Sequence, residues 1–440
     1  MGQSNYSLTR MGRHEQSLGI SLMFSVAGGL FGAVVLIIAA PQLAKIAFQF
    51  TTYEYFWLYV LGLSCAAIVS HGSRLKGGLA LVIGLLFSTV GLSEVHSIPR
   101  FTFGNDELIT GINFIPAMIG LFGLSEVFRN VLGNHEGDFA DQATENAEPG
   151  SASVLKRVFV SLFRLLSVFH SVLLQFVRRP IAALRSSCVG TVIGMIPGAG
   201  ADIAAWISYA VSKRFSKNPD EYGKGSLEGI ADATTANNAA LAGAWIPTLV
   251  LGIPGDSVTA IVIGVLLMKN VTPGPEIFND PKQVVLVHGI YITFILANLL
   301  LIPLGFLAIW SSSLLIRIPR RVLMPLILFF CIVGAFAING SYFDVWVMLG
   351  MGILGFVLER FDVPLGPVVL GIILGGKLEQ SFVQNLTKSS SALPFFGMEK
   401  TSHGLELSHP IAAGLGITCL LLWLTPTLLA VWRRRKAFLK

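Results

Sequence analysis

Helix-breaking Pro-Gly pairs lie inside two long hydrophobic segments of this chain, in GMIPGAGADIAAW at residues 194–206 and in LGIPGDSVTA at residues 251–260. Such breaks free backbone N–H and C=O groups that lipid cannot satisfy with hydrogen bonds. A broken helix at membrane depth is therefore tolerated only where its backbone is buried in protein or lines a watery cavity. Secondary transporters place solute and ion sites at such half-helix ends, so the two breaks are the candidate site.

The composition is that of a membrane protein. Of the 440 residues, 53% are hydrophobic and 13% are charged, whereas soluble domains carry about 25% charged residues. The mean hydropathy is +0.70. The net charge of +6 comes from Lys and Arg in short loops rather than from a basic and aromatic surface, so no nucleic-acid partner is expected. The lone cysteines predict neither disulfides nor a metal centre, and we expect no cofactor.

Apolar runs long enough to span a bilayer recur along the whole chain. They lie near residues 17–40, 53–70, 77–95, 112–132, 186–212, 236–269, 284–310, 322–338, 345–358, 363–377 and 408–432. We therefore predict an all-α polytopic integral membrane protein with about 9–11 spanning helices plus re-entrant or broken helices.

Three regions follow from the same pattern. Residues 1–132 form first-half transmembrane helices and residues 186–440 form a second-half transmembrane domain with the broken helices. Between them, residues 133–185 predict a cytoplasmic linker, whose Arg-rich part near 154–180 is typical of an interfacial amphipathic helix.

Basic residues orient the chain by the positive-inside rule. The tail 433–436 (Arg-Arg-Arg-Lys) and Arg10 and Arg13 predict that both termini are cytoplasmic, with the loop 378–407 outside. The orientations derived from the N-terminal and C-terminal ends agree only if the two broken segments together cross the membrane an odd number of times. Lys213 and Arg214 favour a re-entrant hairpin over residues 186–212.

The first break suits an anion. Pro197 removes one helical hydrogen bond, and Gly198 and Gly200 permit left-handed backbone and close approach of a ligand. If a helix resumes at Ala201, its free N–H groups carry about half a positive charge and suit a carboxylate. The alternative is that these small residues only allow close helix packing. Asp202 follows directly, as an N-terminal cap or as a cation or proton site.

Polar residues surround the second break. Thr235, Asn237 and Asn238 are predicted at the entrance of an apolar helix, where they offer donors and acceptors to a carboxylate, with helix capping as the alternative. The break itself comprises the following residues: Pro254, Gly255, Asp256 and Ser257.

Asp256 allows two interpretations, as the cap of the half-helix after the break or as an ion site. Oxygen atoms of Asn238 and Asp256 form a possible Na⁺ site, and a carboxylate relay would instead carry H⁺.

Three motifs carry a family resemblance. They are GMIPGAGADIAAWISYAVSKRF from Gly194, GKGSLEGIADATTANNAALAGAWIPTLVLGIPGDSVTAIVIG at 223–264 and TPGPEIF at 272–278, with supporting matches at 55–64 and 101–127. The chain resembles the large membrane subunit of tripartite tricarboxylate transporters, the TctA family.

The resemblance implies a bacterial inner-membrane transporter, not an enzyme. It works with a small membrane subunit and a periplasmic solute-binding protein, and it takes up citrate or other carboxylates on an ion gradient. The family's motif positions fall on Pro197, Gly198 and Gly200, on Asn237 and Asn238, and on Pro254, Gly255 and Asp256.

Members of the family carry an earlier region with its own Pro-Gly break, whereas this chain resembles family sequence from the middle of the first half. We therefore expect an inverted-repeat fold with an incomplete first repeat. One alternative is a truncated, non-transporting or split-half subunit. Another is an intramembrane aspartyl protease using two of Asp202, Asp232 and Asp256, since GAGAD is one residue off the GxGD pattern that the resemblance to such proteases requires.

Overall fold

The computed structural model describes residues 14–69, 73–93, 98–132, 179–315, 320–388, 393–401 and 404–438. Its helices are α2 (His14–Ala47), α3 (Thr52–Val69), α4 (Arg74–Ser88), α5 (Phe114–Met118), α6 (Ser125–Leu132), α9 (Pro180–Gly194), α10 (Gly200–Phe215), α11 (Leu227–Leu251), α12 (Ser257–Met268), α13 (Pro281–Leu315), α14 (Arg320–Asn339), α15 (Tyr342–Arg360), α16 (Leu365–Lys388) and α17 (Pro410–Phe438). The π-helical segment η2 (Ile119–Leu124) joins α5 to α6 without interruption.

Short elements connect these helices. They are the 3₁₀ turns η1 (Asp106–Thr110), η3 (Pro219–Glu221), η4 (Pro275–Phe278) and η5 (Leu393–Phe396), and two antiparallel strand pairs, β1 (Gly91–Leu92) with β2 (Pro99–Arg100) and β3 (Met398–Thr401) with β4 (Gly404–Leu407).

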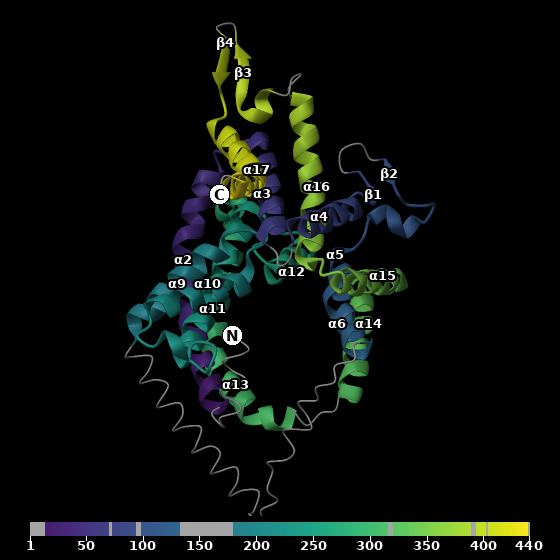
Figure 1. The fold of residues 1–440 in the computed structure, drawn as a ribbon. Coiled ribbons are helices and arrows are strands. Elements are labelled where there is room, and N and C mark those ends of the chain that lie inside the picture. Colours follow the sequence, from purple (N-terminus) through teal and green to yellow (C-terminus); the bar gives the residue numbers. More distant parts are fainter. Residues whose placement is uncertain are drawn as a thin grey trace, which may run out of the picture.

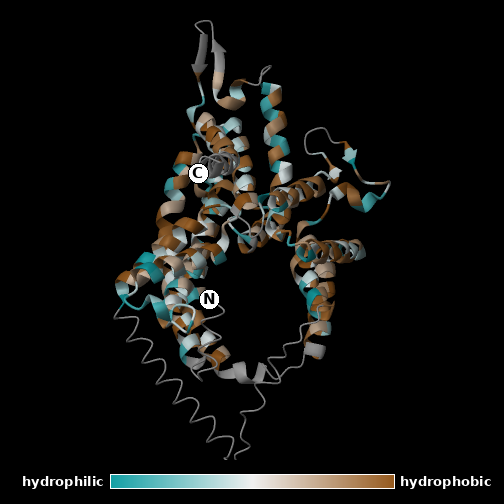
Figure 2. Cartoon of the chain, viewed as in Figure 1, coloured by the Kyte–Doolittle hydropathy of each residue, from teal (hydrophilic) through white to brown (hydrophobic). Residues whose placement is uncertain are grey.

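Five helical stretches in the described ranges are long and apolar enough to cross a membrane. They are Gln16–Ala47, Phe114–Leu132, Pro281–Ile309, Val322–Asn339 and Tyr342–Arg360. Hydrophobic residues predominate along them (Figure 2), and the stretches in α13 and α14 are mostly exposed. Exposed hydrophobic surface of this extent suits lipid rather than water. The prediction of an all-α polytopic membrane protein is confirmed.

Helix α11 lies at the centre of one group of helices, packed against α2, α9 and α10. Small residues allow these close contacts: a Cβ at Gly28 of α2 would overlap the carbonyl of Thr235, and a Cβ at Gly190 of α9 would overlap that of Ala236. Membrane helices associate through such small-residue contacts because lipid gives little hydrophobic driving force between them.

The described helices form groups on opposite sides of the structure. Figure 1 shows α2, α9, α10, α11 and α13 on one side and α6, α14 and α15 on the other, with α3, α4, α12 and α16 above them.

Several predicted boundaries were wrong. Helix α4 ends at Ser88 rather than near residue 95, because Thr89 closes its last turn and Gly91 takes a left-handed conformation. Helix α16 continues to Lys388, through the predicted start of an outer loop at 378. Its extension is held by polar contacts: Glu379 forms a bidentate ion pair with Arg100 at 2.8 Å, and Asn385 donates to the Thr52 carbonyl.

Of the predicted linker and interfacial helix at 133–185, residues 133–178 lie outside the described residues, as do residues 1–13. Residues 180–185 form the first turns of α9.

Candidate functional site

The first broken segment forms a helical hairpin. Helix α9 ends at Gly194 and α10 begins at Gly200, one residue before the predicted restart. The outer ends of the hairpin meet at Glu228, which accepts hydrogen bonds from Arg179 before α9 at 2.6 Å and from Ser216 after α10 at 2.7 Å. The chain therefore returns to the side from which it entered, the shape that the re-entrant prediction requires.

The second broken segment separates α11 from α12. Gly252 ends α11 in a left-handed conformation, φ +68°. Asp256 caps α12 through a capping box: its Oδ1 accepts from the Thr259 N–H at 2.8 Å, and the Asp256 N–H donates to the Thr259 hydroxyl at 3.0 Å. The cap predicted for Asp256 is therefore present, and its role as an ion site stays a prediction.

A hydrogen bond joins the two breaks. The Gly198 N–H donates to the Gly255 carbonyl at 2.9 Å. Gly198 has a φ of +77°, and a Cβ there would overlap the Cα of Ala66. A Cβ at Gly255 would lie 2.6 Å from the Cβ of Ala244. Both glycines are therefore required by close backbone approach, and the two segments form one unit.

A cavity of about 1680 Å³ opens beside this unit. Six of the residues predicted from the sequence line it: Gly198, Gly200, Ala201, Asp202, Asn237 and Asp256. Residues from both breaks and from α11 thus share one wall.

The helix ends at this wall differ in charge. Ala199 stands at the cap position of α10 and makes no side-chain hydrogen bond, so the free N–H groups and the partial positive charge of α10 face the cavity at Gly200 and Ala201. The N-terminus of α12 is already satisfied by Asp256. A Cβ at Gly200 would lie 3.8 Å from the Cβ of Asp256, which places a carboxylate beside the uncapped helix end.

The wall can therefore offer hydrogen-bond donors to an anion, and Asp202 and Asp256 can offer oxygen atoms to a cation nearby.

The remaining predicted residues lie behind this wall. Pro197 packs beside Gly62, the Thr235 hydroxyl donates to the Ala231 carbonyl at 2.8 Å, and Pro254 and Gly255 are buried. Ser257 begins α12, and its side chain is outside the described part of the structure.

Asn238 links three helices instead of facing the cavity. Its amide donates to the Ser25 carbonyl of α2 at 2.8 Å and to Asn298 Oδ1 of α13 at 3.0 Å. The structure thus separates Asn238 from its neighbour Asn237, which lines the cavity.

The predicted position of these polar residues at a helix entrance was wrong. Helix α11 begins at Leu227, and Ser226 caps it by accepting from the Gly229 N–H. Asn237 and Asn238 lie near the middle of the helix, so capping does not explain either of them.

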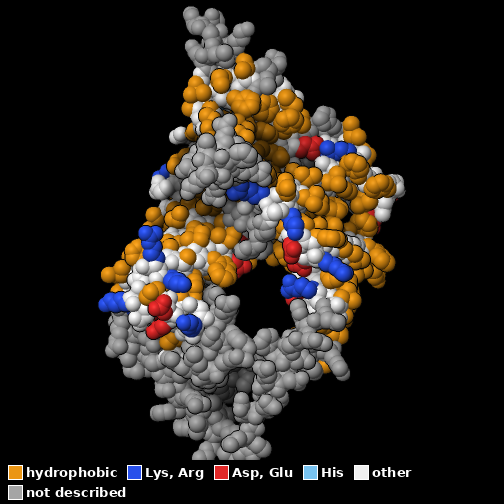
Figure 3. All heavy atoms as spheres, viewed as in Figure 1, with side chains coloured by type: hydrophobic (Ala, Val, Ile, Leu, Met, Phe, Trp, Pro, Cys, Tyr) orange, Lys and Arg blue, Asp and Glu red, His pale blue; other side chains and the backbone are white. Residues whose placement is uncertain are grey.

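Charged residues on the far side of the cavity were missed. Lys76, Arg129, Glu359, Arg360 and Asp362 line it from the ends of α4, α6 and α15. Figure 3 shows charged side chains along the border of the central hollow. Only the Lys and Arg content of these segments could have indicated this grouping, because the contact of α6 with α15 joins residues far apart in the chain.

Comparison with known proteins decides the family. The profile of the tripartite tricarboxylate transporter TctA family matches residues 4–370. The chain belongs to the TctA family. No solved structure matches it.

Two relatives of this TctA chain come from Agrobacterium vitis. An uncharacterized 52.8 kDa protein in the TAR-I ttuC' 3' region is 35% identical over 438 residues, which cover 99% of this chain and 80% of the relative. An uncharacterized protein in the TAR-II ttuC' 3' region is 37% identical over 242 residues, which cover 54% of this chain and 95% of the relative.

Membership in the TctA family confirms the resemblance seen in the sequence. It indicates the large subunit of a tricarboxylate transporter, a multi-pass membrane protein that belongs to a tripartite assembly. A transporter family is consistent with a protein that is not an enzyme, and it speaks against the protease alternative.

Proposed function

We propose that this chain is the large transmembrane subunit of a secondary transporter that takes up tricarboxylates or related carboxylates on an ion gradient. One observation carries the proposal: the uncapped N-terminus of α10 faces the cavity where the two breaks are joined. Its free N–H groups and about half a positive charge suit a carboxylate.

The coupling ion, Na⁺ or H⁺, binds at Asp202 and Asp256 in this proposal. Both carboxylates line the cavity beside the α10 N-terminus, so an anionic solute and a cation neutralise each other there. Asn237 lines the same wall and adds an amide oxygen. Asn238 supports the site by holding α2, α11 and α13 together.

The location is the bacterial inner membrane, with both termini in the cytoplasm. The basic residues at the far side of the cavity, Lys76, Arg129 and Arg360, then face the cytoplasm by the positive-inside rule, so the cavity opens inward. A small membrane subunit and a periplasmic solute-binding protein complete the transporter, and the binding protein delivers the carboxylate from the outer side.

Uptake of radiolabelled citrate tests the proposal in membrane vesicles from cells that express the chain with its partner subunits. An imposed Na⁺ or pH gradient without ATP should drive accumulation. Ala201→Asp should abolish it, because the new carboxylate occupies the anion position at the α10 N-terminus. Gly274→Asp adds the same charge where a Cβ meets no other atom within 4 Å, and it should transport normally. Equal uptake by both variants, at equal membrane levels, rejects this site.

A further inference from the structure

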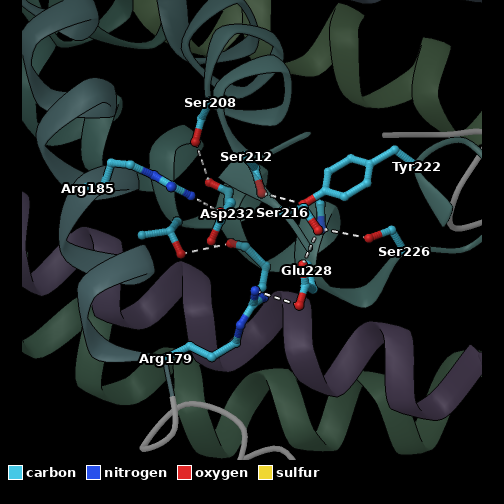
Figure 4. Close-up of polar contacts among 12 residues, drawn as sticks. Arg179, Arg185, Ser208, Ser212, Ser216, Tyr222, Ser226, Glu228 and Asp232 are labelled. Carbon is cyan, nitrogen blue, oxygen red and sulfur yellow. Dashed lines mark hydrogen bonds and ion pairs between the residues drawn. The ribbon is translucent and has the colours of Figure 1, made fainter. Parts of the chain in front are cut away.

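A line of polar contacts leads from the loop between α10 and α11 to a buried carboxylate away from the cavity (Figure 4). The Tyr222 hydroxyl lies 2.7 Å from the Ser212 hydroxyl. Ser212 lies one helical turn after Ser208, whose hydroxyl donates to the Asp232 backbone carbonyl at 2.9 Å, so Ser212 is beside Asp232 without a hydrogen bond of normal geometry to its carboxyl. On its other side, Asp232 Oδ2 accepts a hydrogen bond from Arg185 at 2.7 Å. Tyr222 and Ser212 thus lie between the loop and an ion pair inside the helix group.

Asp232 is almost completely buried, and its hydrogen bonding is incomplete. Its side chain is 1% exposed, whereas that of Arg185 is 30% exposed. Oδ1 has no hydrogen-bond partner of normal geometry among the residues that the structure describes. A buried carboxylate with an unsatisfied oxygen is costly. A proton on Oδ1 removes the buried charge without displacing any hydrogen bond that the carboxyl makes to Arg185.

Asp232 belongs to the contact that closes α9 on α11. Gly190 packs against the backbone of Ala236 and Gly194 against that of Ala240, so tightly that a Cβ at either glycine would overlap the facing helix. Small residues therefore fix the spacing of the two helices along this seam, the contact of residues 186–194 with residues 232–240.

The seam runs from Asp232 to the joined breaks. One turn before Gly190, the same register places Ser186 opposite Asp232, and the Ser186 hydroxyl also lacks a partner within the described ranges. At the other end, a Cβ at Gly255 would lie 2.9 Å from the Gly194 carbonyl. A change at Asp232 therefore acts on the same helix pair that positions Gly255.

Charged and titratable groups around this carboxyl come from four elements of the described structure. They are Arg185 on α9, Arg179 just before α9, Glu228 one turn earlier on α11, Tyr222 in the loop, and Tyr209 on α10, whose ring packs against Tyr222. Helix α10 also contributes the hydroxyl of Ser208, which donates to the Asp232 backbone carbonyl, and that of Ser212, and residues 17–32 of α2 contain no titratable side chain. Burial raises the pKa of the Tyr222 hydroxyl, which therefore stays protonated and able to pass a proton on.

We propose that Asp232 binds the coupling proton, which reaches it along Tyr222 and Ser212. The step adds one proton to the Asp232 carboxylate and gives a neutral carboxylic acid; no other bond changes. Loss of the negative charge weakens the ion pair with Arg185 and loosens the α9–α11 seam. The inference deepens the proposed function and rests on it: it chooses H⁺ over Na⁺ and places the coupling site at Asp232 in place of Asp202 and Asp256.

Infrared spectroscopy tests proton binding without any substrate. Difference spectra of the purified chain in proteoliposomes, recorded on acidification across the physiological range, should show the C=O band of a newly protonated carboxyl. Asp232→Asn should lose this band, whereas Asp202→Asn and Glu228→Gln should keep it. A band that survives in Asp232→Asn, or that disappears only in Asp202→Asn, overturns the proposal.

Citrate transport in the vesicles described above tests coupling. An inward pH gradient of about one unit supports about tenfold accumulation per coupled proton. Asp232→Asn should exchange citrate across the membrane but should not accumulate it, so that the ratio of internal to external citrate stays at one. Asp232→Glu should restore accumulation. Asp220→Asn, an exposed carboxylate of the same loop, is the control and should accumulate normally.

The two hypotheses fail differently. Wild-type vesicles that neither exchange nor accumulate citrate refute the proposed function. In that case the infrared band still shows whether Asp232 binds a proton. Wild-type vesicles that accumulate citrate only on a Na⁺ gradient, or Asp232→Asn vesicles that still respond to the pH gradient, refute the proton site alone.

Discussion

The backbone N–H of Gly198 donates a hydrogen bond to the Gly255 carbonyl at 2.9 Å, although the two glycines lie 57 positions apart in the sequence (255 − 198). This bond satisfies one backbone group of each break, an N–H of the first and a C=O of the second. The N–H groups at the start of α10 have no such partner and face the cavity. The two Pro-Gly motifs therefore act together, one supporting the other, rather than as two equal anion sites.

Gly198→Ala should disrupt this unit. A left-handed backbone costs a residue with a Cβ roughly 1–2 kcal/mol, and here the Cβ would also overlap the Cα of Ala66. We expect loss of citrate uptake and a lower unfolding temperature of the purified protein. Gly350→Ala on α15 is the matched control, since a Cβ there meets nothing within 4 Å. Wild-type behaviour of both variants would show that the joined breaks are not required.

Two substitutions at Asp256 separate its cap from its charge. Asp256→Ala removes the capping box and should destabilise the protein by about 1 kcal/mol. Asp256→Asn keeps a good cap but removes the negative charge beside the α10 N-terminus. We expect Asn to preserve thermal stability and to lower the dependence of uptake on the cation concentration. If Asn and Ala have the same effect on both measurements, the carboxylate acts only as a cap.

Asn237 and Asn238 should have different roles although they are neighbours. A double-mutant cycle of Asn238→Ala and Asn298→Ala should give a coupling energy of about 0.6 kcal/mol, and at most about 1.7, the range for hydrogen bonds between membrane helices. Asn237→Ala should leave stability unchanged and raise the KM for citrate. The opposite assignment, a KM effect at Asn238 alone, would contradict the position of Asn237 in the cavity wall.

Arg360 should attract the anionic solute across the cavity. It lines the cavity and has no ion-pair partner in the described part of the chain, whereas Arg129 pairs with Glu126. Exposed charges contribute up to about 1 kcal/mol, so Arg360→Gln should raise the KM for citrate by about two- to fivefold. The difference from wild type should shrink at high salt because ions screen exposed charges. A difference that does not depend on salt would indicate a structural role.

The sequence predicted the membrane fold and the two breaks because both depend on local composition. Apolar runs identify helices, and Pro-Gly pairs identify their interruptions. The position of Asp256 as a cap followed from the same local rules, although an ion site was an equal alternative.

Long-range pairing was not predictable in this way. The partners of Asn238, Ser25 and Asn298, lie 213 and 60 residues away, and a polar side chain in an apolar helix looks the same whether it binds a solute or another helix. Lys76 and Arg360 reach the cavity only because α4 and α15 end beside it. Helix α16 extends past its apolar part because Arg100 pairs with Glu379, again a distant partner.

Thiol labelling at Ala201 tests most directly whether the α10 N-terminus holds the carboxylate. The four native cysteines, Cys65, Cys188, Cys331 and Cys419, are first replaced by serine or alanine. Ala201→Cys should react with a water-soluble maleimide in vesicles, and citrate should slow the reaction, whereas Ala236→Cys, completely buried in the α9–α11 seam, should not react. An unreactive Ala201→Cys, or labelling that saturating citrate leaves unchanged in vesicles that transport citrate, would contradict an anion site at this helix end.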